Sequence, residues 1–290
     1  MGGTITVAHA VSADGTSIGY EVLGSGPAIV LVQGAMGTAY TFRELAEALA
    51  DTLTVVVPDR RGRGRSPHPF TRSYTIKDDV QDLDAVMAAT GAAYVFGLSS
   101  GGDVTLRAAL ALAAIEKIAV FEPAIFLDGV PRKGSDKFDR YAADSDLAGM
   151  LVTAMKLAQL GPAAMRFMPD WTVKPMISGI IKAEAKSGSG EYAPMAELAA
   201  AFQYDFAIAK SMDGAIGDFR AISQPTLLLG GSKSPAYLGR ALDQLERIIP
   251  NARRVELEGL DHAAAWNVDP RRNAHGDPNA VAAELKTFFA

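Results

Sequence analysis

Five residues set the strongest constraint on how this chain can fold. Residues 97–101 read G-L-S-S-G; a short apolar run at 93–96 precedes them and a stretch with helical periodicity at 103–114 follows. In a sharp turn from a strand into a helix, a side chain on either glycine would collide with its neighbours. The pattern therefore predicts that the hydroxyl of Ser99 is pushed out above the edge of a sheet. The alternative is a turn rich in Gly and Ser without any chemistry, because this pattern often arises by chance.

Strand-like and helix-like segments alternate around this turn. Continuous apolar or β-branched runs predict strands at residues 28–32, 53–57, 93–96, 118–121, 226–229 and 253–257. Helical spacing of apolar residues predicts helices at residues 42–50, 76–89, 103–114, 236–249 and 279–289. We expect the first of these helices to open with a capping box between Thr41 and Glu44. This alternation is typical of a parallel sheet covered by helices on both faces, with sites beyond the carboxyl ends of the strands.

Four ordered motifs run through the chain: Gly34 with Gly37, D-x-R-G-x-G-x-S at 59–66, the serine turn at 97–101 and G-L-D-H at 259–262. In these motifs and their order the chain resembles the α/β-hydrolases, and among them the cap-bearing esterases, lactonases and haloperoxidase-like proteins. The resemblance covers nearly the whole chain. It implies an α/β fold with a mostly parallel eight-stranded sheet, helices on both faces, and a helical cap inserted after the sixth strand.

The middle of the chain has no strong strand runs and is rich in Gly, Pro, Met and Ala. Short amphipathic helices are predicted there at residues 145–160, 174–185 and 195–210. We therefore expect residues 1–122 and 223–290 to form the α/β-hydrolase core and residues 123–222 to form the helical cap. The many Met and aromatic side chains of the cap predict an adaptable apolar lining over a pocket.

Serine hydrolysis needs a base that takes the proton of Ser99, and histidine is the side chain whose pKa suits this task. The histidines of the chain are His9, His68, His262 and His275. Only His262 follows the last predicted strand by a short loop, where the resemblance places the catalytic base. The alternative for His262 is a loop residue with a role at the surface.

The acid that should orient this histidine is displaced from its usual place. The resemblance puts it in the loop after the seventh strand, but Ser234 stands there. Glu122 ends the sixth predicted strand, at the same edge of the sheet, and keeps the chain order of nucleophile, acid and base. We predict Glu122 as the acid; the alternative is that it pairs with an arginine. Asp261 is expected to point away because it adjoins His262, and Asp128 is the remaining candidate.

Two backbone N–H groups are expected to stabilise the oxyanion: that of Ser100, directly after the nucleophile, and that of Ala35, in the loop that Gly34 opens. Where the resemblance expects a histidine before Gly34, the chain has Gln33. Gln33 either satisfies the polar groups of this loop, or points its amide at the substrate and marks a changed reaction.

We predict three substrate-binding residues: Gln33, Met36 and Trp171. Met36 follows the expected oxyanion donor and is a candidate pocket wall, and Trp171 belongs to the apolar set of the cap. A lining of this kind favours a small hydrophobic acyl or aromatic substrate over a sugar or a peptide.

Composition and charge exclude several partners. The chain has no cysteine, which rules out disulfides and thiolate metal sites and fits a reducing cytoplasm, where we expect the protein. The net charge of −5 argues against nucleic acid or an anionic membrane as a partner. We expect no signal peptide, no membrane span, no cofactor and no metal, because no leader pattern, long apolar run or clustered ligand spacing occurs.

The densest basic patch consists of Arg60, Arg61, Arg63 and Arg65. We expect a solvated loop there, with one or two buried ion pairs. The alternative is a site for an anionic part of the substrate.

The sequence therefore predicts a serine hydrolase that cleaves an ester or lactone of a small hydrophobic molecule through Ser99, His262 and Glu122. Two other functions stay open. One is a lyase or cyclase on the same scaffold, in which Ser99 and His262 move protons; Gln33 and the displaced acid motivate it. The other is a small-molecule binder with a vestigial triad. Fold alone does not decide between them, and neither the natural substrate nor the oligomeric state follows from the sequence.

Overall fold

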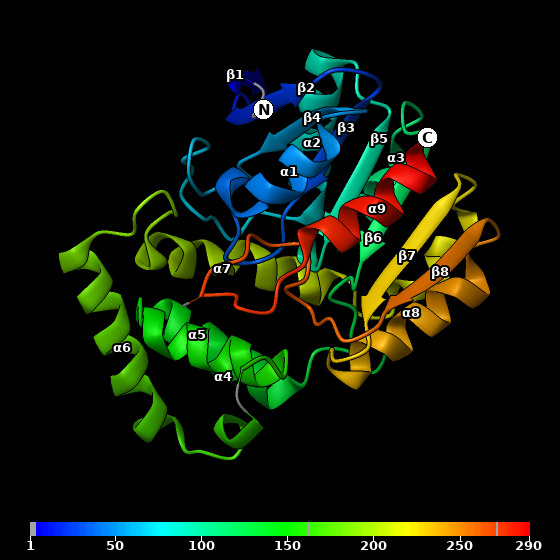
Figure 1. Ribbon diagram of the computed structural model, residues 1–290. Coiled ribbons are helices and arrows are strands. Elements are labelled where there is room, and N and C mark those ends of the chain that lie inside the picture. Colours follow the sequence, from blue (N-terminus) through cyan, green and yellow to red (C-terminus); the bar gives the residue numbers. More distant parts are fainter. Residues whose placement is uncertain (1–3, 162, 271) are drawn as a thin grey trace.

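The centre of the molecule is one sheet of eight short strands (Figure 1). The structure is a computed structural model that describes residues 4–161, 163–270 and 272–290. Its strands are β1 (Thr6–Val11), β2 (Ser17–Gly24), β3 (Ala28–Val32), β4 (Thr54–Pro58), β5 (Tyr94–Leu98), β6 (Lys117–Phe121), β7 (Thr226–Gly231) and β8 (Ala252–Leu257). They lie in the order β1-β2-β4-β3-β5-β6-β7-β8, in which β2 pairs antiparallel with β1 and β4 and all other neighbours are parallel. The predicted eight-stranded, mostly parallel sheet is confirmed.

Each face of the sheet has its own apolar core. In β3, Ile29 and Leu31 belong to one core, whereas Val30 and Val32 belong to the other. The first core is covered by α1 (Arg43–Leu49) and α9 (Pro278–Phe289), the second by α2 (Ile76–Thr90), α3 (Ser100–Ala111) and α8 (Ala236–Ile248). Strands buried on both faces are apolar at every position, and for this reason the continuous apolar runs of the sequence located them.

The start of the first helix differs from the prediction. A short 3₁₀ turn, η1 (Ala39–Phe42), precedes α1, so the capping box predicted between Thr41 and Glu44 is wrong. The box joins Thr38 and Thr41 instead, and the Thr38 N–H donates to Thr41 Oγ1 at 3.0 Å. Glu44 lies within the first turn of α1, where its N–H donates to Oδ1 of Asn267 at 2.9 Å.

Between β6 and β7 the described residues form helices and no strand. These helices are α4 (Arg132–Ala143), α5 (Leu147–Leu157), η2 (Ala163–Arg166), α6 (Asp170–Ser187), α7 (Met195–Ser211) and η3 (Ala215–Ala221). We call residues 122–225 the helical segment. Figure 1 shows α4 to α7 beyond the end of the sheet to which the parallel strands point, and they enclose two small apolar clusters of their own. The segment stands where the cap was expected, and the domain boundaries given above stay a prediction.

Candidate active site

Ser99 occupies a strained turn between β5 and α3. Its φ is 55° and its ψ is −124°, a backbone conformation that is rare for a residue with a side chain. Close approach requires the two glycines: a Cβ on Gly97 would lie 2.3 Å from the carbonyl oxygen of Gly101, and one on Gly101 would lie 2.2 Å from that of Val32. The helix therefore begins directly after the serine, at Ser100, three residues earlier than the periodicity predicted.

Glu122 and His262 are joined by a hydrogen bond at the same edge of the sheet. Glu122 directly follows β6, has a φ of 45° and is 1% exposed. Its Oε2 accepts from Nδ1 of His262 at 2.7 Å, and its Oε1 accepts from the N–H of Gly231, at the end of β7, also at 2.7 Å. This arrangement keeps the proton on Nδ1 of the ring and leaves Nε2 able to accept one.

The other acidic candidates make no such contact with His262. The Oδ1 atom of Asp261 accepts from the N–H of Ala263 at 2.9 Å, so this side chain is used within its own loop. The loop after β7 has Ser234 where the resemblance expects the acid, and the last residue of β7, Gly231, donates its N–H to Glu122. No hydrogen bond joins Asp128 to His262 in the described part of the chain.

Ser99 and His262 line one cavity of about 320 Å³, which we call the Ser99 cavity. It lies between the sheet edge and the helical segment, and its walls are mainly aliphatic, Met and aromatic side chains, among them Met36, Leu151, Met155, Ile177, Phe202, Phe206, Tyr237 and Trp266. No Lys or Arg is among the described residues that line it. No hydrogen bond joins Ser99 Oγ to His262 across the described residues. Such contacts are often long in free enzymes and tighten when substrate binds.

The predicted oxyanion donors lie beside the serine. Ala35, Met36 and Ser100 all line the Ser99 cavity. A Cβ on Gly34 would lie 2.8 Å from the Cβ of Ser99, so the loop after β3 passes directly against the serine. Ser100 is the first residue of α3, and its N–H has no acceptor within that helix. The N–H of Ala35 likewise has no acceptor within the described residues.

Comparison with known families agrees with this geometry. The sequence model described as the Alpha/beta hydrolase family matches residues 29–275 of the chain, a range that includes Ser99, Glu122 and His262. The chain belongs to the alpha/beta hydrolase family.

Three similar proteins are also named as hydrolases. The crystal structure of an alpha/beta hydrolase from Sphaerobacter thermophilus matches with a TM-score of 0.77 and 32% identity, over 98% of this chain and 100% of that one. The 2-(acetamidomethylene)succinate hydrolase of Mesorhizobium japonicum is 27% identical over 251 residues, which is 82% of each protein. The uncharacterized hydrolase YraK of Bacillus subtilis is 41% identical over 95 residues, and this match spans only 35% of that relative's length.

Two predicted substrate contacts of this alpha/beta hydrolase lie outside the Ser99 cavity. Gln33 is 0% exposed, and its Nε2 donates to the carbonyl oxygen of Pro58 at 2.7 Å, which ties the ends of β3 and β4 together. These contacts favour its structural interpretation. Trp171 is 76% exposed at the start of α6, because that helix turns Val173 and Ile177 inward and Trp171 lies off this face. Of the three residues, only Met36 reaches the cavity.

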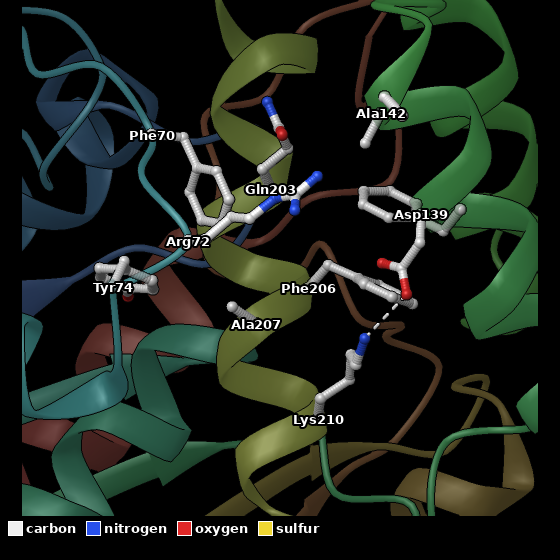
Figure 2. A pocket seen from close by; sticks show the side chains of 11 residues that line it. Phe70, Arg72, Tyr74, Asp139, Ala142, Gln203, Phe206, Ala207 and Lys210 are labelled. Carbon is white, nitrogen blue, oxygen red and sulfur yellow. Dashed lines mark hydrogen bonds and ion pairs between the residues drawn. The ribbon is translucent and has the colours of Figure 1, made fainter.

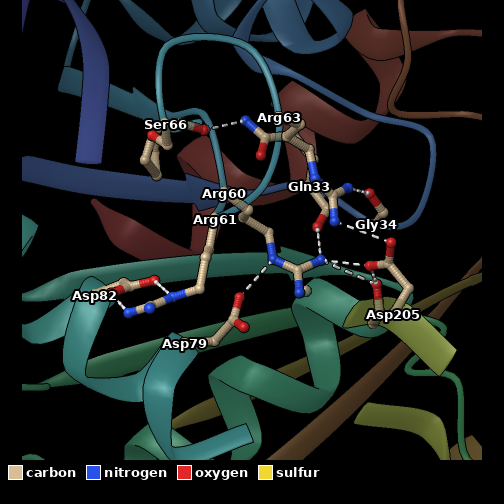
Figure 3. Close-up of polar contacts among 12 residues, drawn as sticks. Gln33, Gly34, Arg60, Arg61, Arg63, Ser66, Asp79, Asp82 and Asp205 are labelled. Atoms are coloured by element: carbon tan, nitrogen blue, oxygen red, sulfur yellow. Dashed lines mark hydrogen bonds and ion pairs between the residues drawn. The ribbon is translucent and has the colours of Figure 1, made fainter. Parts of the chain in front are cut away.

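Three of the four arginines in the basic loop after β4 are buried and paired with carboxylates, so the prediction of a solvated loop with one or two buried ion pairs is wrong (Figure 3). Arg60, Arg61 and Arg63 are at most 4% exposed. Their partners come from distant parts of the chain: Arg60 pairs with Asp79 (2.8 Å) and Asp205 (2.7 Å), Arg61 with Asp82 (2.7 Å) and Asp14 (2.6 Å), and Arg63 with Asp205 (2.9 Å). Arg65 reaches Glu21 (2.7 Å) and Asp59 (3.1 Å). Because the protein's own carboxylates engage all four arginines, their contacts disfavour a substrate-anion site.

Burial and pairing act in opposite directions on this network. Burial by itself would lower the pKa of Arg60, but the carboxylates of Asp79 and Asp205 raise it above its ordinary value. Burial by itself would raise the pKa of Asp205, but the guanidinium groups of Arg63 and Arg60 hold it below its usual range. Both Arg60 and Asp205 are therefore charged at neutral pH.

Two residues of the Ser99 cavity were not anticipated. Asp205 lines it from α7, and its Oδ1 accepts a hydrogen bond from Oγ of Ser100 at 2.7 Å. Its signal in the sequence was a carboxylate placed between aromatic residues, Tyr204 and Phe206, in an apolar helix. Tyr237 lines the cavity from the first turn of α8, and burial raises the pKa of its hydroxyl. We find no sequence signal for Tyr237.

A second pocket of about 640 Å³ lies between α4, α7 and the loop before α2 (Figure 2). Aromatic and charged side chains line it, among them Phe70, Arg72, Tyr74, Phe138, Asp139, Phe206 and Lys210. Phe206 also lines the Ser99 cavity, and its ring stacks on that of Phe138 with centroids 3.9 Å apart. The two spaces thus share one aromatic wall.

The described ranges contain no group of three or more His, Asp or Glu side chains that could bind a metal ion. Among the same residues, no helix is both long enough and apolar enough to cross a membrane. The expectations about cofactors, partners and location stay predictions.

Proposed function

We propose that the protein is a serine hydrolase that cleaves an ester or lactone of a small hydrophobic molecule. The observation that carries this proposal is the 2.7 Å hydrogen bond between Glu122 and His262, with the ring of His262 and the strained Ser99 in one cavity. An acid that orients a histidine beside a nucleophile is the arrangement that acyl transfer needs. The three relatives named above are hydrolases by name, which supports the class of reaction.

In the proposed mechanism, Ser99 Oγ attacks the carbonyl carbon while Nε2 of His262 takes its proton. Glu122 stabilises the charged ring, and the N–H groups of Ala35 and Ser100 stabilise the oxyanion. The tetrahedral intermediate collapses, His262 protonates the leaving alkoxide, and the acyl-enzyme remains. Water, deprotonated by His262, then releases the carboxylic acid and restores Ser99.

The lining of the Ser99 cavity supports a neutral substrate. Among its described lining residues the only carboxylate is that of Asp205, which is paired with Arg60 and Arg63, and no Lys or Arg is present. A carboxylate on the substrate would lose its hydration there without gaining a cation. The Mesorhizobium relative is named for a succinate derivative, and the cavity of this chain favours an uncharged ester instead.

Covalent labelling with a small fluorophosphonate tests the proposal by intact mass. We expect one adduct per chain on the wild type and none on Ser99→Ala. Labelling of His262→Ala and Glu122→Gln should be slower by about 10³-fold or more, because removing triad members costs about that much. Asp261→Asn is the matched control, since Asp261 adjoins His262 but bonds only within its loop among the described residues; we expect it to label at the wild-type rate.

Three labelling outcomes would each contradict a different part of the proposal. A wild type that forms no adduct contradicts the hydrolase and directs attention to the lyase, cyclase or binding alternatives. An adduct that survives in Ser99→Ala excludes Ser99 as the nucleophile. Wild-type labelling of Glu122→Gln removes Glu122 from the triad but leaves the other two residues in place.

A further inference from the structure

The buried carboxylate of Asp205 connects the helical segment to the serine turn (Figure 3). The residue is 3% exposed and comes from α7. Its Oδ1 accepts from Ser100 Oγ and from Nη1 of Arg60, each at 2.7 Å, and its Oδ2 accepts from Nη2 of Arg63 at 2.9 Å. The proposed mechanism assigns no role to this side chain.

The same two arginines hold the loop after β3. Nη1 of Arg60 donates to the carbonyl oxygen of Gln33 at 3.2 Å and to Ser100 Oγ at 3.1 Å. Nη1 of Arg63 donates to the carbonyl oxygens of Gly34 at 3.3 Å and Gly37 at 3.4 Å. These carbonyl groups flank Ala35, so the network touches both sides of the place where an oxyanion would form.

We propose that Asp205 is a positioning residue that sets the spacing of the two oxyanion donors. Through its own bond to Ser100 and through Arg60 and Arg63, it holds the start of α3 against the loop at residues 33–37. This inference rests on the proposed function. It adds that the oxyanion hole is complete only when α7 is seated on the sheet edge, because the carboxylate that closes the network comes from the helical segment.

The carboxylate has no substitute among the described residues. Asp205 is the only carboxylate there that pairs with Arg63, whereas Arg60 has Asp79 as a second partner. Asp205→Asn keeps the shape of the side chain but removes the charge, so the guanidinium group of Arg63 is left buried without a counter-ion. We expect the loop to shift, and a shift of about 1 Å is enough to cost catalysis about 100-fold.

The chain offers a matched control in Asp82→Asn. Asp82 and Arg61 form another buried pair, with Arg61 Nε and Nη2 donating to the carboxylate at 2.9 Å and 2.7 Å, and Arg61 has Asp14 as a second partner. In the described part of the chain, neither residue forms a hydrogen bond with Ser100 or with residues 33–37. The two variants thus remove the same kind of charge, one at the serine turn and one away from it.

The experiment compares kcat and KM for p-nitrophenyl butyrate in the wild type and both variants, with the Tm of each as a folding check. It also compares the inhibition constants of an alkyl trifluoromethyl ketone, which forms a tetrahedral adduct with an active-site serine, and of the alkyl methyl ketone of the same length. For Asp205→Asn we expect kcat to fall by about 30- to 300-fold with KM within about threefold, and the trifluoromethyl ketone to weaken in parallel. The methyl ketone and all values of Asp82→Asn should stay within about threefold of the wild type.

Three results would overturn the inference. One is unchanged kcat and trifluoromethyl ketone inhibition in Asp205→Asn. Another is an equal loss in Asp82→Asn, which would assign the effect to general stability. If Asp205→Asn does not fold, Ser100→Ala replaces it, because it removes only the hydroxyl that donates to Asp205; unchanged kinetics there again contradict the role. Failure of the wild type to hydrolyse the ester or to take the fluorophosphonate would instead contradict the proposed function.

Discussion

At the scale of single residues, backbone strain gathers where chemistry is proposed. Met36, Ser99 and Glu122 are three of the five non-glycine residues of the described chain that have a positive φ. Such conformations cost about 1–3 kcal/mol each and persist only where the surroundings hold them. Hydrogen bonds to neighbouring strands fix two of these residues: the Ser99 N–H donates to Phe121 O at 2.9 Å, and the Glu122 N–H donates to Leu229 O at 3.0 Å.

The serine turn should tolerate no added methyl group. For Gly101→Ala we expect the free energy of unfolding to fall by about 1–3 kcal/mol or more, because the new Cβ would lie 2.2 Å from the carbonyl oxygen of Val32. Gly179→Ala is the control: this glycine is exposed in α6 with no atom within 4 Å of its Cβ position, so alanine should raise stability by about 0.5–1 kcal/mol. Urea unfolding of both variants checks this. Equal effects would show that close approach does not govern the turn.

The sequence located the residues that follow strands, and missed contacts that depend on distant partners. Ser99 and Glu122 were identifiable because the carboxyl ends of parallel strands meet at one edge. The burial of Arg60 was not, because its partners Asp79 and Asp205 lie on α2 and α7, and no local pattern pairs them. The side chain of Gln33 was equally undecidable, since its acceptor is the end of another strand.

At the scale of elements, continuous apolar strands were predictable and one polar helix was not. Each predicted strand and helix of the α/β pattern is confirmed, with ends that shift by a few residues. The sequence of α4 is rich in charge and Phe138 is its only buried residue, so few large apolar side chains mark the inner face of this helix. Packing of α4 on α5 and stacking of Phe138 on Phe206 stabilise this helix, and neither contact can be read from its own sequence.

Asp170, in the first turn of α6, links this helix to α4 and α5 within the helical segment. Its carboxylate pairs with Lys137 of α4 and, at 2.8 Å, with Lys156 of α5. For Asp170→Asn we expect a loss of about 1 kcal/mol in the free energy of unfolding at neutral pH. Asp139→Asn breaks a more exposed pair with Lys210 and should cost less than about 0.5 kcal/mol. A smaller effect of Asp170→Asn than of Asp139→Asn would contradict the assignment.

The ion pairs of Asp170 should make the stability difference between the wild type and Asp170→Asn depend on pH. Burial by itself would raise the pKa of Asp170, but hydrogen bonds from Lys137 and Lys156 hold it below its usual value. A carboxyl group with a lowered pKa stabilises the folded state above its unfolded pKa of about 3.9, and this contribution is lost as pH falls through the folded value. The advantage of the wild type over Asp170→Asn should therefore shrink between about pH 5 and pH 3. Thermal unfolding across this range measures it, and an advantage that grows in acid would refute it.

At the scale of the whole molecule, charge and cavity favour the same substrates. The chain carries a net charge of −5, and no cation is among the described residues that line the Ser99 cavity. Both features disfavour an anionic substrate, one during approach and the other after binding.

A pair of esters that differ by one charge tests this. We expect kcat/KM for the methyl p-nitrophenyl diester of succinic acid to exceed that for the p-nitrophenyl monoester by about 100-fold or more at neutral pH. A 100-fold ratio corresponds to about 2.7 kcal/mol. Burial of an unpaired carboxylate costs at least this much free energy. Comparable rates for the two esters would mean that a cation reaches the substrate.

The place of His262 after β8 also sets when the proposed catalytic residues can all be present during synthesis. The proposed nucleophile and oxyanion donors precede the helical segment and the proposed acid, Glu122, is its first residue, while His262 follows β8, at the far edge of the sheet. A ribosome must therefore translate the whole helical segment and the last strand before the proposed base exists. A nascent chain that ends before residue 262 already carries Ser99 but lacks the proposed base.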